Sequence, residues 1–253
     1  MQAMKQIALA LFVALALPGA MLAKGAKEPP AMGYLPTVDY RVIIGPPPAP
    51  GSAQANADRA AFAKTTAEIG SPRYNYASTQ LAPSSKQVMQ QLSCAIGHQV
   101  SPATTPLTIA FIKRIRTDID RPVNSAKSHF SRDRPFVGAD DPRTCDPRTA
   151  IRIMPKSPPR PNYSYPSGHA AIGALFGAVF AAAVPGRAAV VREWGSDFGS
   201  NRLVCRVHWQ SDVAAGRKLA DAVYARLKAD PAFARDLAAV RSELAVAAPA
   251  FSC

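Results

Sequence analysis

Three short segments of the chain carry side chains of the kinds that bind and transfer a negatively charged group. The first runs from Lys127 to Pro135, and its cations Lys127 and Arg134 would share one face if the segment were helical. We expect Pro135 to end that helix or close its last turn. The absence of an acid three or four positions after Lys127 is unusual for a solvated face. Taken alone, the pair is nevertheless more typical of an exposed basic surface.

The second segment is Tyr165-Pro166-Ser167-Gly168-His169, which directly precedes an apolar stretch. Ser167 is a good N-cap residue, so a helix is expected to begin there. The free N–H groups of its first turn and the helix dipole would then favour an anion, and Gly168 would let the backbone approach it. His169 would stand at the rim of that site. An ordinary helix start with an incidental histidine is the alternative.

The third segment, Arg202 to Asp212, contains His208 four residues before Asp212. On one helix face, the carboxylate would bind one ring nitrogen and leave the other free to attack. Arg202 reaches the same pocket if the helix begins between Arg202 and His208. A lone His/Asp pair is more often structural than catalytic.

Taken together, the segments provide three cations, a helix N-terminus, two histidines and one carboxylate. This set suits phosphoryl transfer, which needs charge neutralised on the equatorial oxygens and the two apical groups held in line. One histidine would attack while the other protonates the leaving oxygen. The sequence offers no carboxylate cluster for Mg²⁺ or Zn²⁺, so we expect no metal and no other cofactor.

The same residues resemble the signature of the type 2 phosphatidic-acid phosphatase superfamily, which reads K-x6-RP, PSGH and SR-x5-H-x3-D. All three blocks occur here in order and at matching spacing. The flanking residues are more narrowly similar to bacterial class A non-specific acid phosphatases, in the segments Ser125-Ala126-Lys127, Ser164 to His169 and Cys205 to Asp212. The resemblance extends from about Pro46 to Ala247 and is loose over residues 53–105.

The resemblance implies a metal-independent acid phosphatase that hydrolyses small phosphomonoesters at acidic pH. His208 would become a phosphohistidine, with Asp212 as its orienting partner, and this intermediate could also pass phosphate to another alcohol. His169 would be the general acid and later the base for water. The residues implied in phosphate binding are Lys127, Arg134, Ser167, Gly168 and Arg202. One position departs from the pattern, because Asn201 stands where the family usually has serine, which puts that phosphate contact in doubt.

The elements that must position these residues are predicted to be helices, because no convincing strand pair is present. Residues 140–162, rich in proline, aspartate and arginine, are expected to form a loop. Ala170–Val184 is strongly apolar but contains Gly173 and Gly177, and favours a buried core helix over a membrane span. From periodicity and capping signals, helices are expected over residues 58–69, 84–96, 104–124, 167–184, 187–200, 204–229 and 231–247. The fold class is therefore all-α, implied by the resemblance to be a helical bundle of the phosphatase and vanadium haloperoxidase kind.

The N-terminal quarter of the chain differs from the rest in composition. Residues 1–23 have the short basic start and apolar stretch of a secretory signal peptide, although a retained membrane anchor is the alternative. The cleavage position stays open. Residues 24–57 are rich in proline, alanine and glycine and indicate an extended arm. A single helical phosphatase domain over residues 58–253 follows, and the mature protein would be periplasmic or secreted.

Four cysteines, an even number in an exported chain, suggest two disulfides. Their spacings do not form a zinc pattern, and three pairings are open from the sequence alone. The resemblance favours Cys145–Cys205 and Cys94–Cys253, because such phosphatases carry cysteines at positions 145 and 205.

The composition limits the partners of the protein. Apolar residues make up 48% of the chain, which excludes a disordered protein, and the formal net charge of +13 favours anionic partners. If the protein were a basic nucleic-acid-binding protein, the matching spacing of the three blocks would be a coincidence, so nucleic-acid binding is not expected as a main role.

We expect no integral membrane domain, since an integral lipid phosphatase would need several spans. A vanadium-dependent haloperoxidase shares the motif set, but the compact chain and the class A flanks argue against it. The sequence reveals neither the physiological substrate nor the oligomeric state, although the family often forms homo-oligomers.

Overall fold

Helices make up nearly all of the regular structure. The computed structural model describes residues 31–83, 85–146, 163–250 and 253. Within these residues the only β feature is an isolated bridge between His98 and Pro249, and the all-α class is confirmed. In chain order the helices are α1 (Tyr40–Ile44), α2 (Ala53–Lys64), α3 (Pro72–Ser78), α4 (Lys86–Ile96), α5 (Pro106–Phe130), α7 (Gly168–Ala183), α8 (Ala188–Val204), α9 (Gln210–Leu227) and α10 (Pro231–Val246). The predicted signal peptide and most of the predicted loop over residues 140–162 lie outside the described residues.

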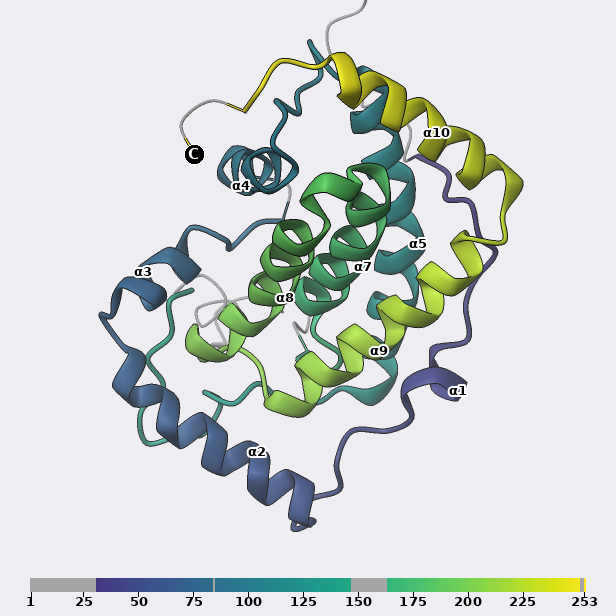
Figure 1. Ribbon diagram of the computed structural model, residues 1–253. Coiled ribbons are helices and arrows are strands. Elements are labelled where there is room, and N and C mark those ends of the chain that lie inside the picture. Colours follow the sequence, from purple (N-terminus) through teal and green to yellow (C-terminus); the bar gives the residue numbers. More distant parts are fainter. Residues whose placement is uncertain (1–30, 84, 147–162, 251–252) are drawn as a thin grey trace, which may run out of the picture. The chain divides into compact units, whose positions relative to one another are not determined.

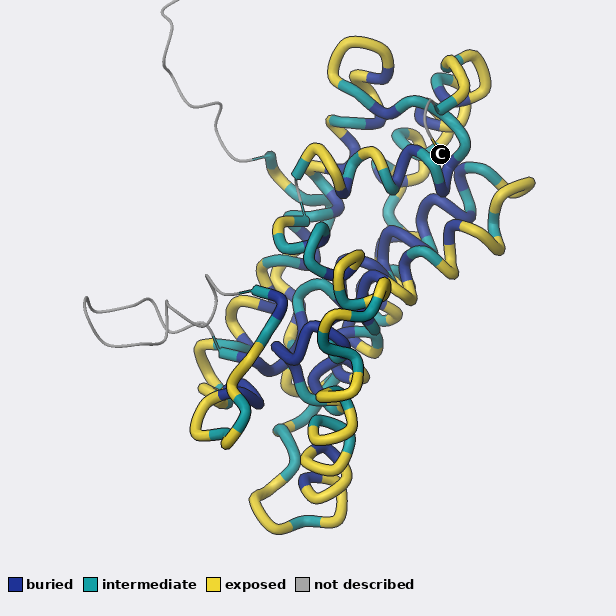
Figure 2. The backbone as a smooth tube through the Cα atoms, turned by 90° about the vertical axis from the view of Figure 1, so that its left-hand side faces the viewer, coloured by how far each residue is buried: buried dark blue, intermediate teal, exposed yellow. Residues whose placement is uncertain are grey.

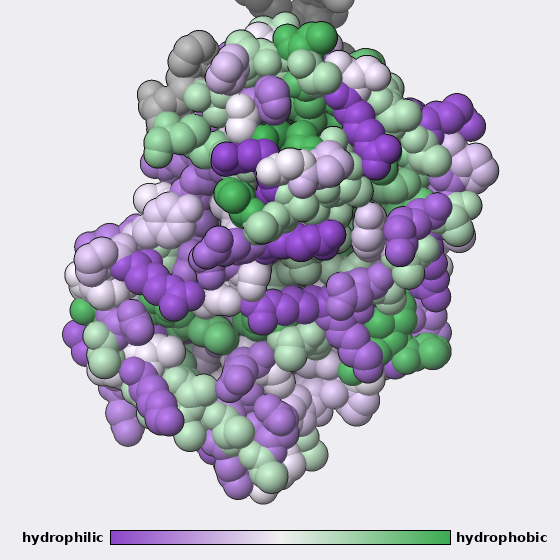
Figure 3. Space-filling model, in the orientation of Figure 1, coloured by the Kyte–Doolittle hydropathy of each residue, from purple (hydrophilic) through white to green (hydrophobic). Residues whose placement is uncertain are grey.

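The apolar helix α7 is the centre of the core, and α5, α8, α9 and α10 pack against it (Figure 1). Most of its residues are buried, which confirms the core helix expected over residues 167–184. In Figure 2 the buried backbone runs through the interior of the helical body, while exposed turns lie at its margins. None of the helices in the described part of the chain is both long and apolar enough to cross a membrane. Hydrophilic side chains cover much of the face seen in Figure 3.

Glycines bring α7 into direct backbone contact with its neighbours. A Cβ added at Gly173 would lie 2.3 Å from the carbonyl oxygen of Gly195 in α8. At Gly216 of α9, an added Cβ would lie 2.4 Å from the carbonyl oxygen of Ser167, just before α7 begins. Larger residues at either position would force the helices apart. The start of α7 is therefore held against the second turn of α9.

Two boundaries in the first half of the chain differ from the sequence prediction. Helix α2 begins at Ala53, inside the predicted arm, because the Ser52 side chain caps it. The arm also contains the short helix α1, and its Tyr34 ring packs against Phe111 and Phe233. The arm is thus more ordered than proline content alone indicated.

Helix α5 was expected to end at Asn124 and continues to Phe130, with Pro122 inside it. It ends where Ser131 takes a left-handed conformation with φ of 50°. Lys127 therefore lies in the last turn of α5, whereas Arg134 lies beyond the helix. The prediction that Lys127 and Arg134 share one helix face is wrong, because the chain turns at Ser131 rather than at Pro135.

The second half contains a break that the sequence did not reveal. Helix α8 runs to Val204, and α9 begins only at Gln210. Between them Arg206 has φ of 64°, and its buried guanidinium donates to the carbonyl oxygens of Arg143 and Asp141. These contacts hold a non-helical connection over residues 205–209, so the helix predicted over residues 204–229 is shorter than expected. The helix predicted over residues 231–247 is confirmed as α10.

Two disulfides join distant parts of the chain. Cys145 pairs with Cys205 at the start of the connection between α8 and α9, and Cys94 of α4 pairs with Cys253. Both pairings implied by the resemblance are present. The first disulfide ties that connection to the segment that follows α5.

Candidate active site

The side chains singled out from the sequence lie in one region, at the first turns of α7 and α9 and the ends of α5 and α8. Arg134 lies 3.3 Å from the His208 ring, and the Ser167 N–H donates to the Asp212 carbonyl oxygen at 2.9 Å. Most members of the set have almost no exposed surface, which is unusual for so many charged groups. The buried members are Arg134, Ser167, Arg202, His208 and Asp212.

His208 lies on the connection before α9 rather than on a helix, so the predicted shared helix face with Asp212 is wrong. The contact itself is present, since His208 Nδ1 lies 3.2 Å from Asp212 Oδ2. The same Oδ2 accepts the Trp209 N–H at 2.8 Å, as expected for an acid in the first turn of α9. The carboxylate therefore both caps α9 and orients the His208 ring.

The other ring nitrogen of His208 faces a cation. Its Nε2 lies 3.3 Å from Arg134 Nη1, which is a donor, so Nε2 accepts and carries the lone pair. Burial, followed by the charges of Arg134, Lys127 and Arg202, lowers the pKa of His208 well below its usual value. The ring is therefore neutral, with its proton on Nδ1 toward Asp212 and its lone pair on Nε2.

Asp212 is supported by two residues that sequence reasoning missed. Arg132 Nη1 donates to Asp212 Oδ1 at 2.7 Å, and Arg132 Nη2 donates to Asp58 Oδ2 at 2.8 Å. Asp58, in α2, also accepts the Ser211 N–H at 2.9 Å. Burial raises the pKa of Asp212, and the Arg132 charge opposes that rise. Arg132 lies inside the first motif block, but its spacing to Asp58 and Asp212 carried no signal.

The three cations are costly to bury without an anion. Burial lowers the pKa of Lys127 to about 7, with Arg134 adding to the effect. Burial also lowers the pKa of Arg134 and of Arg202 to about 10. Arg202 Nη2 donates to the Ala77 carbonyl oxygen at 2.6 Å, whereas its buried Nε has no partner among the described residues. An oxyanion beside Arg202 would satisfy that donor.

The start of α7 is arranged as the sequence predicted. Ser167 Oγ accepts the Ala170 N–H at 3.4 Å, so the N–H groups of Gly168 and His169 belong to a first turn that lacks backbone partners. A Cβ added at Gly168 would meet only Val123 among the described residues, at an ordinary 3.6 Å. Packing therefore does not require glycine at position 168.

His169 has a partner of a different kind from that of His208. Its Nε2 lies 2.9 Å from the backbone carbonyl oxygen of Gln80, an acceptor, so Nε2 carries a proton. Its ring packs against Phe198 with centroids 5.1 Å apart. Burial, followed by the Arg202 charge, lowers the pKa of His169 well below its usual value.

Asn201, the residue that departs from the motif, is buried and engaged at both ends of its amide. Its Nδ2 donates to Gln80 Oε1 at 3.0 Å, and its Oδ1 accepts from Arg73 Nε at 3.2 Å. These contacts occupy the amide within the protein. Sequence reasoning missed Gln80, because nothing in its local pattern distinguishes it.

The described residues contain no group of three or more His, Cys, Asp or Glu side chains that could hold a metal ion. The charged groups that lower the pKa values of the two histidines are instead cationic, namely Lys127, Arg134 and Arg202. A site of this composition suits an anion of more than one negative charge.

Comparison with known proteins gives concordant matches. The model of the PAP2 superfamily matches residues 106–228. The non-specific acid phosphatase of Salmonella typhimurium is 36% identical over 209 residues, which are 82% of this chain and 81% of that protein. An acid phosphatase of Zymomonas mobilis is 33% identical over 219 residues, or 86% and 80% of the two chains. The non-specific acid phosphatase of Providencia stuartii is 28% identical over 209 residues, or 82% of each.

Proposed function

The chain belongs to the PAP2 superfamily and is an acid phosphatase, and from that premise we propose that it acts through a phosphohistidine on His208, without a metal ion and best at acidic pH. The proposal depends mainly on one observation, the protonation state and orientation of the His208 ring. Asp212 holds the proton on Nδ1, and Nε2 faces the Arg134 guanidinium with its lone pair available. A nucleophile and an oxyanion-binding group are thus side by side.

In the first step the phosphate of a monoester binds among Lys127, Arg134 and Arg202. The guanidinium groups take its non-bridging oxygens, and the unpaired Nε of Arg202 gains a partner. The N–H groups of Gly168 and His169 at the start of α7 add further donors. The cations supply the charge neutralisation that many phosphoryl-transfer enzymes obtain from metal ions.

In the second step His208 Nε2 attacks the phosphorus atom. An N–P bond forms while the ester P–O bond breaks, and the alcohol oxygen leaves with the bonding electron pair. His169 donates the proton on its Nδ1 to that oxygen, while Nε2 keeps its own proton, which is hydrogen-bonded to the Gln80 carbonyl oxygen. Asp212 stabilises the positive charge that develops on the His208 ring.

In the third step water cleaves the N–P bond. Neutral His169 removes a proton from the attacking water through Nδ1, and inorganic phosphate forms as His208 regains its lone pair. His169 is then ready for the next cycle as a general acid. An alcohol in place of water would accept the phosphate instead, by the same chemistry.

The acidic optimum follows from the electrostatics of His169. Burial, followed by the Arg202 charge, lowers the pKa of His169 in the free enzyme, so few molecules carry the Nδ1 proton at neutral pH. A bound phosphate offsets the Arg202 charge and raises that pKa toward its usual value. Activity is therefore expected to increase as the pH falls from neutrality, until the phosphate itself loses its second charge.

The site of action is proposed to be the periplasm or the exterior. Disulfides such as Cys94–Cys253 and Cys145–Cys205 persist in oxidising compartments, and the expected signal peptide over residues 1–23 would direct export. Small phosphomonoesters are the proposed substrates.

The decisive test combines chelation, mutation and trapping of the intermediate. Hydrolysis of p-nitrophenyl phosphate should persist in excess EDTA and disappear in the His208→Ala variant. The exposed His129→Ala serves as the matched control and should keep full activity. Acid-labile, alkali-stable phosphate should be trapped on the wild-type protein. Activity lost in EDTA would overturn the metal-free mechanism, and alkali-labile protein phosphate would identify another nucleophile.

A further inference from the structure

The amide of Gln80 lies at the centre of a buried network next to His169. Its side chain is fully buried, and its Oε1 accepts from Asn201 Nδ2 at 3.0 Å. Its Nε2 donates to Gln91 Oε1 at 2.8 Å. Since both ends of the amide are occupied, Gln80 cannot shift without breaking a buried hydrogen bond.

The backbone around Gln80 is anchored as well. The Gln80 N–H donates to the Ala77 carbonyl oxygen at 3.2 Å, which closes the turn after α3. The same Ala77 oxygen accepts from Arg202 Nη2 at 2.6 Å. One short turn is thus fastened to α8 through Asn201 and Arg202, and it presents the Gln80 carbonyl oxygen to His169 Nε2.

We propose that Gln80 and Asn201 form a positioning pair that holds His169 as the Nε2-protonated ring with Nδ1 toward the leaving oxygen. The inference rests on the general-acid role of His169 proposed above. Asn201 occupies the position where the family signature has serine, and it acts on the reaction through Gln80 rather than by touching phosphate. Neither residue is catalytic, since neither meets the reacting atoms.

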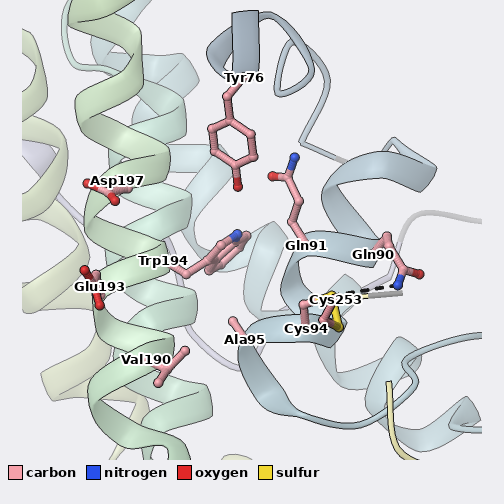
Figure 4. Close-up of a pocket in the computed structure, with 10 residues that line it drawn as sticks. All are labelled: Tyr76, Gln90, Gln91, Cys94, Ala95, Val190, Glu193, Trp194, Asp197 and Cys253. Atoms are coloured by element: carbon pink, nitrogen blue, oxygen red, sulfur yellow. Dashed lines mark hydrogen bonds between the residues drawn. A yellow bond between two sulfur atoms is a disulfide. The ribbon is translucent and has the colours of Figure 1, made fainter. Parts of the chain in front are cut away.

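The contact of Gln80 with Gln91, near the protein surface, is expected to be weaker than its buried contact with Asn201. Figure 4 shows Gln91 beside Tyr76 and Trp194 at a pocket of about 500 Å³ between α4 and α8. Water in such an open pocket competes for the Gln91 amide, whereas the Gln80–Asn201 contact is shielded. We therefore expect the Gln80 and Asn201 side chains to matter more than that of Gln91.

The test measures the dependence of kcat/KM on the leaving group. General acid assistance matters most for a poor leaving group such as phenolate and least for a good one such as 2,4-dinitrophenolate. Gln80→Leu should lower kcat/KM by about 10-fold to 100-fold on phenyl phosphate and by less than about 3-fold on 2,4-dinitrophenyl phosphate. The ratio of the two values in one preparation does not depend on the fraction of folded protein.

Asn201→Ser supplies a second variant that restores the family's residue. A positioning role predicts the same change of ratio as in Gln80→Leu, and Gln91→Leu should give a smaller change. If Asn201 instead bound phosphate as the family's serine would, the serine variant would leave the ratio unchanged. Gln90→Leu, on the exposed side of α4, is the matched control and should behave as wild type.

His169→Ala separates the two proposals. If its ratio changes while Gln80→Leu and Asn201→Ser keep the wild-type ratio, the positioning pair is overturned and the proposed function stands. If the His169→Ala ratio is also that of wild type, His169 is not the general acid and the inference falls with that part of the mechanism. An equal fall on both esters in the Gln80 and Asn201 variants would indicate a packing role and overturn the inference.

Discussion

The two histidines of the site are held by opposite kinds of support. His208 binds a carboxylate, Asp212, which is paired with Arg132, and Arg132 in turn with Asp58. His169 binds a backbone carbonyl, and the side chains behind that carbonyl are the neutral amides of Gln80 and Asn201.

This difference matches the two chemical tasks proposed for the rings. A carboxylate stabilises positive charge on its histidine, which helps a nucleophile that becomes a charged phosphohistidine. A carbonyl orients the ring with much less stabilisation of the imidazolium, so the proton is released more readily. The proposed roles of His208 as nucleophile and of His169 as general acid thus fit two different kinds of support.

The largest expected effect comes from removing the charge beside His208. Asp212→Asn keeps the shape of the side chain but loses the carboxylate and allows the wrong ring tautomer. We expect kcat/KM to fall on the order of 10⁴-fold, on good and poor leaving groups alike. Steady-state kinetics with both esters checks this prediction. A loss confined to poor leaving groups would mean that the His208 support resembles that of His169.

Removing His169, the proposed general acid, should lower kcat/KM less than Asp212→Asn does, and mainly for esters with poor leaving groups. His169→Ala is expected to lower kcat/KM on the order of 10²-fold to 10⁴-fold on phenyl phosphate, and under about 10-fold on 2,4-dinitrophenyl phosphate. Steady-state kinetics with the same two esters tests this prediction. His98→Ala, a histidine bonded to a carbonyl near the end of α10, is the control that should show no such selectivity.

Asp58, which reaches His208 through Arg132 and Asp212, should affect the stability of the fold more than the rate of catalysis. Asp58→Asn leaves the largely buried Arg132 with Asp212 as its remaining anionic partner among the described residues. The free energy of unfolding should fall by about 1–3 kcal/mol, with only a modest loss of kcat/KM. Urea denaturation checks this value. Asp39→Asn, which breaks the exposed pair with Arg41, is the matched control and should leave the midpoint unchanged.

The smallest effect concerns stability and pH. Both histidines have lowered pKa values in the folded protein. At pH values between these lowered pKa values and the usual one of about 6.5, the unfolded chain therefore binds more protons than the folded chain. Stability is therefore complete above about pH 6.5 and decreases as the pH falls, by at most about 1.4 kcal/mol per pH unit for each histidine. The slope should be shallower in His208→Gln and with added inorganic phosphate, measured by urea denaturation from neutral to acidic pH. A wild-type slope in His208→Gln would show that His208 does not contribute.

Local signals in the sequence were sufficient for the helices that depend on them. Ser167 and the apolar run that follows predicted α7, and the limits of α4 and α10 lie within two residues of those expected. Caps and periodicity act within one or two turns of chain, so they can be recognised without knowledge of the fold. The candidate residues named from the three motif blocks likewise lie together in the structure, but Asp58, Arg132 and Gln80, which support them, were not among those named.

The break between α8 and α9 depended on distant partners instead. No glycine or proline marks residues 204–210, and the connection is held by the Cys145–Cys205 disulfide and by the Arg206 contacts with the loop after α5. The end of α5 at Ser131 was missed for another reason, because the left-handed conformation of Ser131 has no strong sequence signal.

The sequence by itself determined the all-α class, the main helices and the residues of the three blocks, because each depends on short-range spacing. The sequence also predicted Asp212 as the partner of His208, whereas only the tertiary structure decided what supports Asp212 and what holds His169. Asp58 meets Arg132, and Gln80 meets Asn201 and His169, across large separations in sequence. Such contacts arise when buried polar groups must find partners as the helices pack, and that requirement leaves no periodic trace in the chain.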